Sequence, residues 1–249
     1  MPDKNSLVAI VTGAAGGIGS AIVDAFLRQG MTVVAVDIAT GSLSGQFQNA
    51  LDQGKLFLTT ADLTDSKSWP GILEFCRASC GSVNVLVNNA GRIIRKDIGE
   101  TTESDWDKQI DVNLKASYFL SKLCAEVMRQ NGWGRIINLS SQAGQTGGAE
   151  DCPIYAISKG GIDTMTRSFA RRYANDGVTV NAIAPGVVMT DMIQKTLTEE
   201  RIDAVIKQIP IGRVTEASEI AAAAVYLCSE DAGSITGHVL DVNGGILMH

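Results

Sequence analysis

The chain has 249 residues with 21 basic and 27 acidic side chains, and its net charge of −6 argues against a general attraction for nucleic acid or anionic lipid. Hydrophobic residues make up 45% and charged residues 19%, as in ordinary globular proteins, and no apolar run approaches the roughly 18 residues that span a bilayer. Five scattered cysteines and only two histidines predict buried thiols, with neither a disulfide framework nor a metal site.

The first residues, Met1 to Ser6, lead directly into an apolar run and lack the residue order of a secretion signal, so a cytoplasmic location is expected. After them, short runs rich in Val, Ile and Leu alternate with longer segments of helical periodicity. Runs that are apolar throughout are typical of strands buried on both faces of a parallel sheet. The predicted strands are Val8–Val11, Thr32–Val36, Leu56–Thr60, Val83–Val87, Arg135–Leu139, Val178–Ile183 and His238–Val242. The predicted helices are Gly19–Gln29, Ser66–Ser79, Glu103–Arg129, Ile154–Ala174 and Ala217–Ser229.

This alternation predicts right-handed βαβ crossovers and a doubly wound α/β sheet with helices on both faces. Since no linker or repeat divides the chain, residues 1–249 are expected to form one domain. Two helix starts carry capping signals. Thr102 stands before Glu103 with Asp105 three residues on, and Thr215 precedes the last predicted helix.

The first strand is followed by a glycine loop, Thr12-Gly13-Ala14-Ala15-Gly16-Gly17-Ile18-Gly19, with the spacing G-x-x-x-G-x-G. We expect Gly13 to make the turn out of the strand, Gly17 to let the backbone approach a pyrophosphate, and Gly19 to let the helix pack closely. The helix N-terminus then offers free N–H groups and a positive dipole end to the phosphates. The loop therefore predicts a dinucleotide site.

Residues with acidic or amide side chains stand at or just after the ends of the next three predicted strands. Asp37, about 20 residues beyond the loop, would accept hydrogen bonds from the adenine ribose and repel a 2′-phosphate. Because no Arg or Lys stands within several residues of it, Asp37 favours NAD over NADP, unless it is an ordinary turn aspartate. Asp62 could hold the adenine amino group. Asn88 and Asn89 are either cofactor neighbours or simple strand-end turn residues.

Tyr155 and Lys159 stand four residues apart in a predicted helix and so share one face. A tyrosine base needs its pKa lowered from about 10 by about 2–3 units, which a nearby ammonium and a positively charged nicotinamide could supply together. Ser141 could stabilise charge on a substrate oxygen, and Asn113 could hold a water that links Lys159 to solvent. Each residue taken alone also has an ordinary structural explanation.

With these motifs in this order, the sequence resembles a short-chain dehydrogenase/reductase with a G-x-x-x-G-x-G loop and a Tyr-x-x-x-Lys pair. The resemblance covers essentially the whole chain and includes Pro185-Gly186, Thr190 and the closing Val242-Asn243-Gly244-Gly245. It implies a Rossmann-type sheet of seven strands and an NAD-dependent oxidoreductase acting on CH–OH groups. It also implies a homotetramer, with the Tyr155 helix in one interface. The implied catalytic tetrad is Asn113, Ser141, Tyr155 and Lys159.

The resemblance further implies how NAD is held along the cleft. Lys159 would bind the nicotinamide ribose, while the Val188 main chain and Thr190 would hold the carboxamide. The residues expected to bind NAD are Gly13, Ala15, Gly16, Gly17, Ile18, Gly19, Asp37, Asp62, Leu63, Asn89, Ala90, Gly91, Tyr155, Lys159, Pro185, Gly186, Val188 and Thr190.

Substrate selection is expected in three loops at the carboxyl edge of the sheet, residues 92–98, 142–154 and 189–210. The first loop holds the basic cluster Arg92-Ile93-Ile94-Arg95-Lys96, which is either a solvated loop or suited to an anionic or polyhydroxylated substrate. The third is interpreted as a substrate lid over about 189–210. Polar residues in the second favour a polar substrate such as a sugar, sugar acid or polyol. The residues expected to contact substrate are Ile93, Arg95, Ser141, Gln142, Cys152 and Tyr155.

Two other functions stay open. The sequence also resembles 3-oxoacyl-carrier-protein reductases, which mostly use NADPH and carry basic residues where the acidic carrier docks. The corresponding places here are Asn131-Gly132-Trp133 and Asn175-Asp176, and together with Asp37 they favour another role. The alternative of another class is an NAD-binding scaffold or sensor without turnover, against which the complete tetrad argues. The expected partners are thus NAD, a small-molecule substrate and further copies of the chain, with no nucleic acid or membrane.

Overall fold

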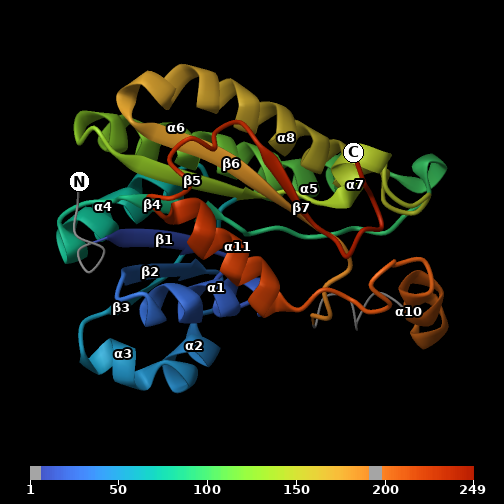
Figure 1. The fold of residues 1–249 in the computed structure, drawn as a ribbon, viewed down its shortest axis with the longest axis horizontal. Coiled ribbons are helices and arrows are strands. Elements are labelled where there is room, and N and C mark those ends of the chain that lie inside the picture. The colour runs from blue at the N-terminus through green and yellow to red at the C-terminus, as the bar shows by residue number, and fades with distance from the viewer. Residues whose placement is uncertain (1–6, 191–197) are drawn as a thin grey trace.

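The computed structural model describes residues 7–190 and 198–249, and seven strands form one parallel sheet in it (Figure 1). The strands lie in the order β3-β2-β1-β4-β5-β6-β7, and Val11 of β1 lies between Ala35 of β2 and Val87 of β4. The predicted doubly wound parallel sheet is therefore confirmed. The strands are β1 Val8–Thr12, β2 Thr32–Asp37, β3 Leu56–Thr60, β4 Val85–Asn88, β5 Gly134–Leu139, β6 Val178–Pro185 and β7 Val239–Val242.

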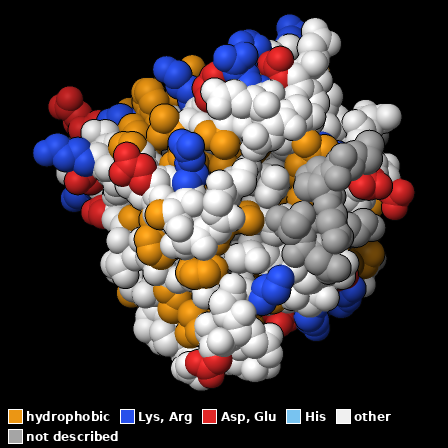
Figure 2. All heavy atoms as spheres, turned by 90° about the vertical axis from the view of Figure 1, so that its left-hand side faces the viewer, with side chains coloured by type: hydrophobic (Ala, Val, Ile, Leu, Met, Phe, Trp, Pro, Cys, Tyr) orange, Lys and Arg blue, Asp and Glu red, His pale blue; other side chains and the backbone are white. Residues whose placement is uncertain are grey.

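The strand order reverses between β1 and β4, so the loops that follow these two strands leave the same carboxyl edge in opposite directions. Such a switch point leaves a crevice in which open α/β sheets bind ligands. The short helices α7 and α10 lie at this end of the molecule, on the right of Figure 1. On the opposite end, shown in Figure 2, Lys and Arg side chains are interspersed with Asp and Glu rather than gathered in one patch.

Helices cover both faces of the sheet (Figure 1). Helices α1 and α11 pack together against one face, and α4, α6 and α8 lie against the other. None of the helices in the described part of the chain is both long and apolar enough to cross a membrane. The helices are α1 Gly17–Arg28, α2 Gly41–Gln46, α3 Gln48–Asp52, α4 Ser68–Cys80, α5 Glu103–Ile110, α6 Ala116–Gln130, α7 Gln142–Thr146, α8 Pro153–Tyr173, α10 Glu199–Ile206 and α11 Ala217–Cys228.

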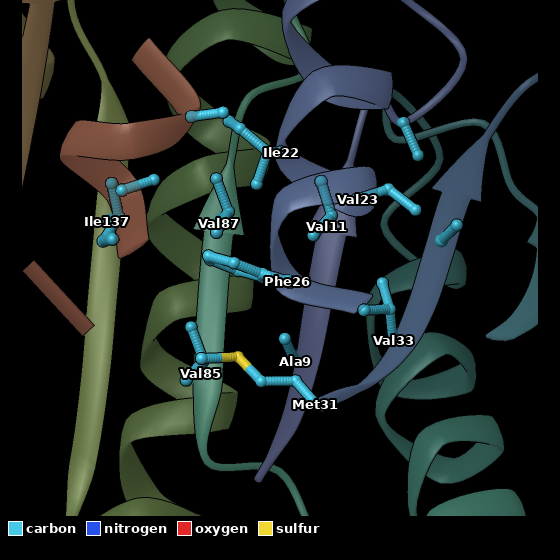
Figure 3. Close-up of a cluster of buried hydrophobic side chains, with 14 of the residues drawn as sticks. Ala9, Val11, Ile22, Val23, Phe26, Met31, Val33, Val85, Val87 and Ile137 are labelled. Carbon is cyan, nitrogen blue, oxygen red and sulfur yellow. The ribbon is translucent and has the colours of Figure 1, made fainter. Parts of the chain in front are cut away.

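The apolar runs supply both faces of the sheet, because successive side chains of a strand point to opposite sides. In β1, Ala9 and Val11 join the core under α1 and α11, while Val8 and Ile10 join the core under α4, α6 and α8. Figure 3 shows side chains of α1, among them Phe26, lying over this first core. Burial on both faces explains why the strands are apolar throughout rather than alternating.

Three differences from the predicted elements stand out. The long helix predicted over Glu103–Arg129 is interrupted by a π-helical turn, Asp111–Lys115, between α5 and α6. The fourth strand begins at Val85 rather than Val83. Helix α11 is capped by Glu216, because the Thr215 hydroxyl instead donates to the Val242 carbonyl at 3.3 Å.

The other predicted elements begin and end within about two residues of the observed ones, and some short helices were not predicted. The capping box of Thr102 and Asp105 at the start of α5 is confirmed. Helices α2, α3 and α7 were not predicted, because they are five or six residues long, rich in Gly, Ser and Gln, and too short to show an apolar period.

Candidate active site

The glycine loop after β1 packs against the end of β4 with no room for side chains. Gly13 has φ of +62°, and a Cβ there would lie 2.7 Å from the Cα of Ala90. A Cβ at Gly19 would overlap the Gly13 carbonyl oxygen. The Thr12 hydroxyl ties the two loops together, because it accepts the N–H groups of Asn89 and Ala90 at 3.1 Å each. This closeness leaves exposed backbone that a pyrophosphate can approach.

The segment after β6 lies over this loop. A Cβ at Gly17 would lie 3.0 Å from Cγ2 of Thr190, so the expected carboxamide-binding residue stands beside the expected phosphate loop. Val188 forms a bridge with Thr215, and the Gly186 N–H donates to the Val242 carbonyl at 3.1 Å. Helix α1 starts after Gly16, Ile18 lies in its first turn, and no side chain caps it, so its first N–H groups stay available for an anion.

As predicted, one carboxylate, Asp37, is the last residue of β2, and another, Asp62, lies just beyond the end of β3. Asp37 Oδ2 accepts the N–H of Ala15 at 2.9 Å, so it braces the glycine loop as well as facing the crevice edge. Asp62 accepts the N–H and hydroxyl of Thr64, which hold the pKa of Asp62 below its usual value. Leu63 is buried in the core and offers only its main chain.

A cavity of about 590 Å³ opens beside these carboxylates and is lined by Ile38, Asp62 and side chains of α5. Its volume suits an adenosine group. Arg92 and Lys108 also line it. Basic groups therefore do stand near the expected adenosine position, although none is close to Asp37 in the sequence.

The two asparagines after β4 have structural hydrogen bonds. Asn88 is buried and donates to Ser121 Oγ and Asn138 Oδ1, both at 2.8 Å. Asn89 donates to the carbonyl oxygens of Thr12 and Gly13, each at 2.9 Å. Both side chains thus hold the loops of β1, β4 and β5 together, which matches the turn-residue interpretation.

Asn113 lies in the π-helical turn rather than in the middle of a regular helix. Its Oδ1 accepts the Arg92 N–H at 2.8 Å, and its Nδ2 donates to the Arg92 carbonyl at 3.0 Å and to Ser158 Oγ at 3.1 Å. Both N–H donors are engaged, so a water can use the second lone pair of Oδ1. A Cβ at Gly91 would lie 3.2 Å from that oxygen and 3.8 Å from Lys159 Nζ, so Asn113 and Lys159 border the same gap.

Lys159 is buried, and its Nζ donates to the Leu139 carbonyl at 2.5 Å. This ammonium lies 5.6 Å from the centre of the Tyr155 ring, which confirms that the two side chains share a face of α8. Burial lowers the pKa of Lys159 to about 8. The amine therefore keeps its proton at neutral pH yet can release it with little driving force, as a proton relay requires.

The predicted lowering of the Tyr155 pKa depends on Lys159 together with a charged nicotinamide, and the burial of the ring acts in the opposite direction. Burial raises the pKa of Tyr155 above its usual value, and the nearby Ser141 hydroxyl offsets this only in part. Ser141 caps α7 and accepts the Ala143 N–H at 3.1 Å. Desolvation disfavours a phenolate, so the structure presents a protonated phenol beside a serine hydroxyl.

The basic cluster predicted in the first substrate loop does not form one patch. Arg92 lines the cavity near Asp62, Arg95 pairs with Asp151 at 2.8 Å, and Lys96 pairs with Asp105 at 2.7 Å. The three charges diverge because successive residues of an extended loop point to different sides. Only Arg95 remains on the side of Tyr155, where its charge acts on the Tyr155 pKa.

The other expected substrate residues surround the same region. Cys152 is buried, its Sγ meets the Ala149 carbonyl at 3.4 Å, and burial raises its pKa, so it is an unreactive thiol. Ile93 is half-buried. Gln142 has a buried Oε1 without a hydrogen-bond partner among residues 7–190 and 198–249. Of the lid predicted over 189–210, helix α10 is present, and residues 191–197 lie outside the described residues.

Sequence reasoning missed two residues that position this site. Ser158 holds the Asn113 amide, and its place beside Lys159 carries no sequence signal. Asp151 joins Arg95 to Arg201 of α10, three segments that are far apart in the chain. Such contacts follow only from tertiary packing.

All five cysteines are unpaired, and four of them are buried. Within residues 7–190 and 198–249, no group of three His, Cys, Asp or Glu side chains is arranged to hold a metal ion.

Comparisons with known proteins agree with this geometry. The family model described as enoyl-(acyl carrier protein) reductase matches residues 13–247. The 3-oxoacyl-[acyl-carrier-protein] reductase FabG of Vibrio harveyi is 36% identical over 241 residues, 97% of each chain. Nodulation protein G of Azospirillum brasilense is 37% identical over 249 residues, covering 96% of this chain and 97% of that protein.

Solved structures are similarly close. A Brucella melitensis protein described as a short-chain dehydrogenase/reductase, glucose/ribitol dehydrogenase, superposes with a TM-score of 0.91 at 29% identity over 98% of both chains. The crystal structure of gox2181 gives a TM-score of 0.91 at 28% identity, over 96% of this chain and 95% of that one.

Proposed function

Because the chain belongs to the short-chain dehydrogenase/reductase family of oxidoreductases, we propose that it moves a hydride between NAD and a secondary alcohol or its ketone. The substrate is a small polar molecule such as a sugar, sugar acid or polyol. The observation that carries this proposal is the convergence of Tyr155, Lys159, Ser141 and Asn113 at the carboxyl edge of β4 and β5.

The residues present fit a nicotinamide dinucleotide. The side-chain-free cradle at Gly13, Gly17 and Gly19 leaves room for the pyrophosphate, and the neighbouring cavity of about 590 Å³ suits the adenosine. Asp37 would meet the ribose hydroxyls and oppose a 2′-phosphate, which supports NAD, although Arg92 and Lys108 line the cavity too. When bound, the cofactor supplies the hydride donor or acceptor.

The mechanism follows from the charges and hydrogen bonds of the four residues. Ser141 and Tyr155 hold the substrate oxygen, and Tyr155 gives a proton to a ketone or takes one from an alcohol. Lys159, with its pKa of about 8, passes that proton on. The gap beside Gly91 lets a water at Asn113 Oδ1 connect Lys159 to solvent. In the alcohol direction, the positive charge of Lys159 and of the oxidised nicotinamide must overcome the burial that raises the Tyr155 pKa.

The test is Tyr155→Phe, which removes the hydroxyl and keeps the ring. We expect the turnover number for the best alcohol substrate to fall by at least about 10²-fold, while the dissociation constant for NAD stays within about twofold. Tyr226→Phe on α11, where the ring is exposed, is the matched control and should behave as wild type. Near-normal turnover by Tyr155→Phe would overturn the proposed role.

Reduction of 3-oxoacyl groups on a carrier protein is the second candidate, since several relatives bear that name. Two basic side chains near the expected docking places are paired with carboxylates. The nearby Arg129 pairs with Glu126 and Arg172 pairs with Asp176, so their charges are balanced. A substrate screen with sugars, sugar acids, polyols and hydroxyacyl thioesters, with NAD and then NADP, separates the two candidates and also tests for a scaffold without turnover.

We further propose that residues 1–249 act as one domain in a cytoplasmic homotetramer. Tyr118 and Phe119 of α6 and Ile157 of α8 are exposed large side chains, and burying such a face would favour association. Sedimentation of the purified protein tests this assembly.

A further inference from the structure

Arg95, in the first of the expected substrate loops, has a buried donor without an acceptor among the described residues. Its Nη1 donates to Asp151 Oδ1 at 2.8 Å, and only 20% of its side chain is exposed. Its Nε is buried and finds no acceptor in the described part of the chain. A buried donor without an acceptor costs about 1–3 kcal/mol, and the exposed fifth of the Arg95 side chain is where a ligand oxygen can approach the guanidinium.

The charge around Arg95 is unbalanced. Arg201 of α10 donates to the other oxygen of Asp151 at 3.1 Å, so one carboxylate faces two guanidinium groups. Among the described residues, no further carboxylate pairs with either arginine. The Lys96 N–H donates to the Asp151 main-chain carbonyl at 2.8 Å, which fixes the loop of Arg95 against the loop of Asp151. One positive charge is therefore left for a ligand.

This charge lies within electrostatic reach of the chemistry. The guanidinium of Arg95 lowers the pKa of both Tyr155 and Cys152, against the burial that raises them. Gln142, directly after Ser141, has a buried Oε1 that receives no hydrogen bond from the residues that the structure describes. An amide oxygen accepts from a hydroxyl and cannot bind a carboxylate, whereas a guanidinium prefers a carboxylate.

We propose that Arg95 binds a carboxylate of the substrate and that Gln142 accepts one of its hydroxyls, so that the substrate is a sugar acid rather than a neutral sugar or polyol. This inference rests on the proposed function and narrows its substrate class. Asp151 holds the Arg95 guanidinium in place, and the second charge, on Arg201, adds to the attraction for an anion.

The experiment compares sugar acids with the polyols of the same carbon chain, gluconate with sorbitol and galactonate with galactitol. Each pair differs only in a carboxylate against a CH₂OH group. We expect wild-type kcat/KM to be at least about tenfold higher for the acid, because a hydrogen bond to a charged group contributes about 1.5–3 kcal/mol. Arg95→Gln should lose this preference through a higher KM for the acid, while any change that the lost charge makes through the Tyr155 pKa should affect acid and polyol alike.

Two further variants separate binding from loop structure. Arg95→Lys keeps the charge without the planar fork and should retain part of the preference. Arg77→Gln, an exposed residue of α4, makes the same charge change far from the pocket and should leave both activities as in wild type. Thermal unfolding of each variant reports any loss of stability.

The outcomes are distinct. Equal use of acid and polyol by the wild type, or an equal loss of both in Arg95→Gln, would show that Arg95 only ties the loops together and would overturn the inference. Turnover of polyols alone would leave the proposed function intact and end this inference. If no compound in the panel is turned over, while NAD binds, both proposals fail.

Discussion

Replacing Lys159 by Met should remove activity and yet lift a large penalty from the folded chain. Burial lowers the pKa of this ammonium from 10.5 to about 8. A shift of that size corresponds to about 3 kcal/mol of free energy that folding loses when the group is charged. Met has a similar length and carries no charge, so the variant does not suffer this loss.

The lowered pKa of Lys159 makes the stability of the wild type depend on pH between about 8 and 10.5. The unfolded chain holds the Lys159 proton up to about pH 10.5, while the folded chain releases it near pH 8. The penalty is therefore complete below pH 8 and disappears as the pH rises towards 10.5. Over that range, the free energy of unfolding of the wild type should gain about 3 kcal/mol relative to Lys159→Met.

The lost hydrogen bond to the Leu139 carbonyl acts in the opposite direction. A buried acceptor left unpaired costs about 1–3 kcal/mol, which offsets part of the gain at neutral pH. Because the carbonyl does not titrate, this cost is the same at every pH and leaves the pH-dependent difference unchanged.

Urea unfolding near pH 7 and near pH 10 measures this difference. Lys67→Met, in which an exposed lysine is replaced, controls for the general loss of one positive charge. If the stability gap between wild type and Lys159→Met is the same at both pH values, the ammonium is not desolvated, and the reasoning about its role as a proton relay is refuted.

Two other variants test the cofactor site. Gly19→Ala should weaken NAD binding at least about tenfold and destabilise the fold by about 1–3 kcal/mol, because the new Cβ would overlap the Gly13 carbonyl oxygen and lie 2.8 Å from Asn89 Nδ2. The control is Gly71→Ala on α4, where a Cβ would have nothing within 4 Å, and this variant should be neutral or stabilising. Equal changes in the stability of the two variants, measured by calorimetry, would contradict the steric argument. Asp37→Ala should lower the ratio of kcat/KM for NAD over NADP at least about tenfold, since a carboxylate beside a 2′-phosphate is removed; an unchanged ratio would speak against the ribose assignment.

Much of the fold could be predicted because local chemistry determines it. Continuous apolar runs located every strand to within two or three residues at each end, and the Thr102 capping box marked the start of α5. The interruption at Asn113 could not be predicted, since a single π-helical turn adds only one residue to the helical register and this small shift is not recognisable in the apolar pattern. The family can likewise be recognised from the sequence, because the glycine loop and the pair Tyr155 and Lys159 are local motifs.

The sequence by itself determined which side chains share a face and which loops leave the same edge, because periodicity and chain direction are local properties. Only the tertiary structure decided how charges were paired and how deeply groups were buried. Arg92 lines the cavity beside Asp62, whereas Arg95 pairs with Asp151, which also meets Arg201 fifty residues away. Burial raises the Tyr155 pKa, an effect that the sequence does not indicate. Desolvation and pairing depend on every element packed around a group, and no stretch of sequence contains that information.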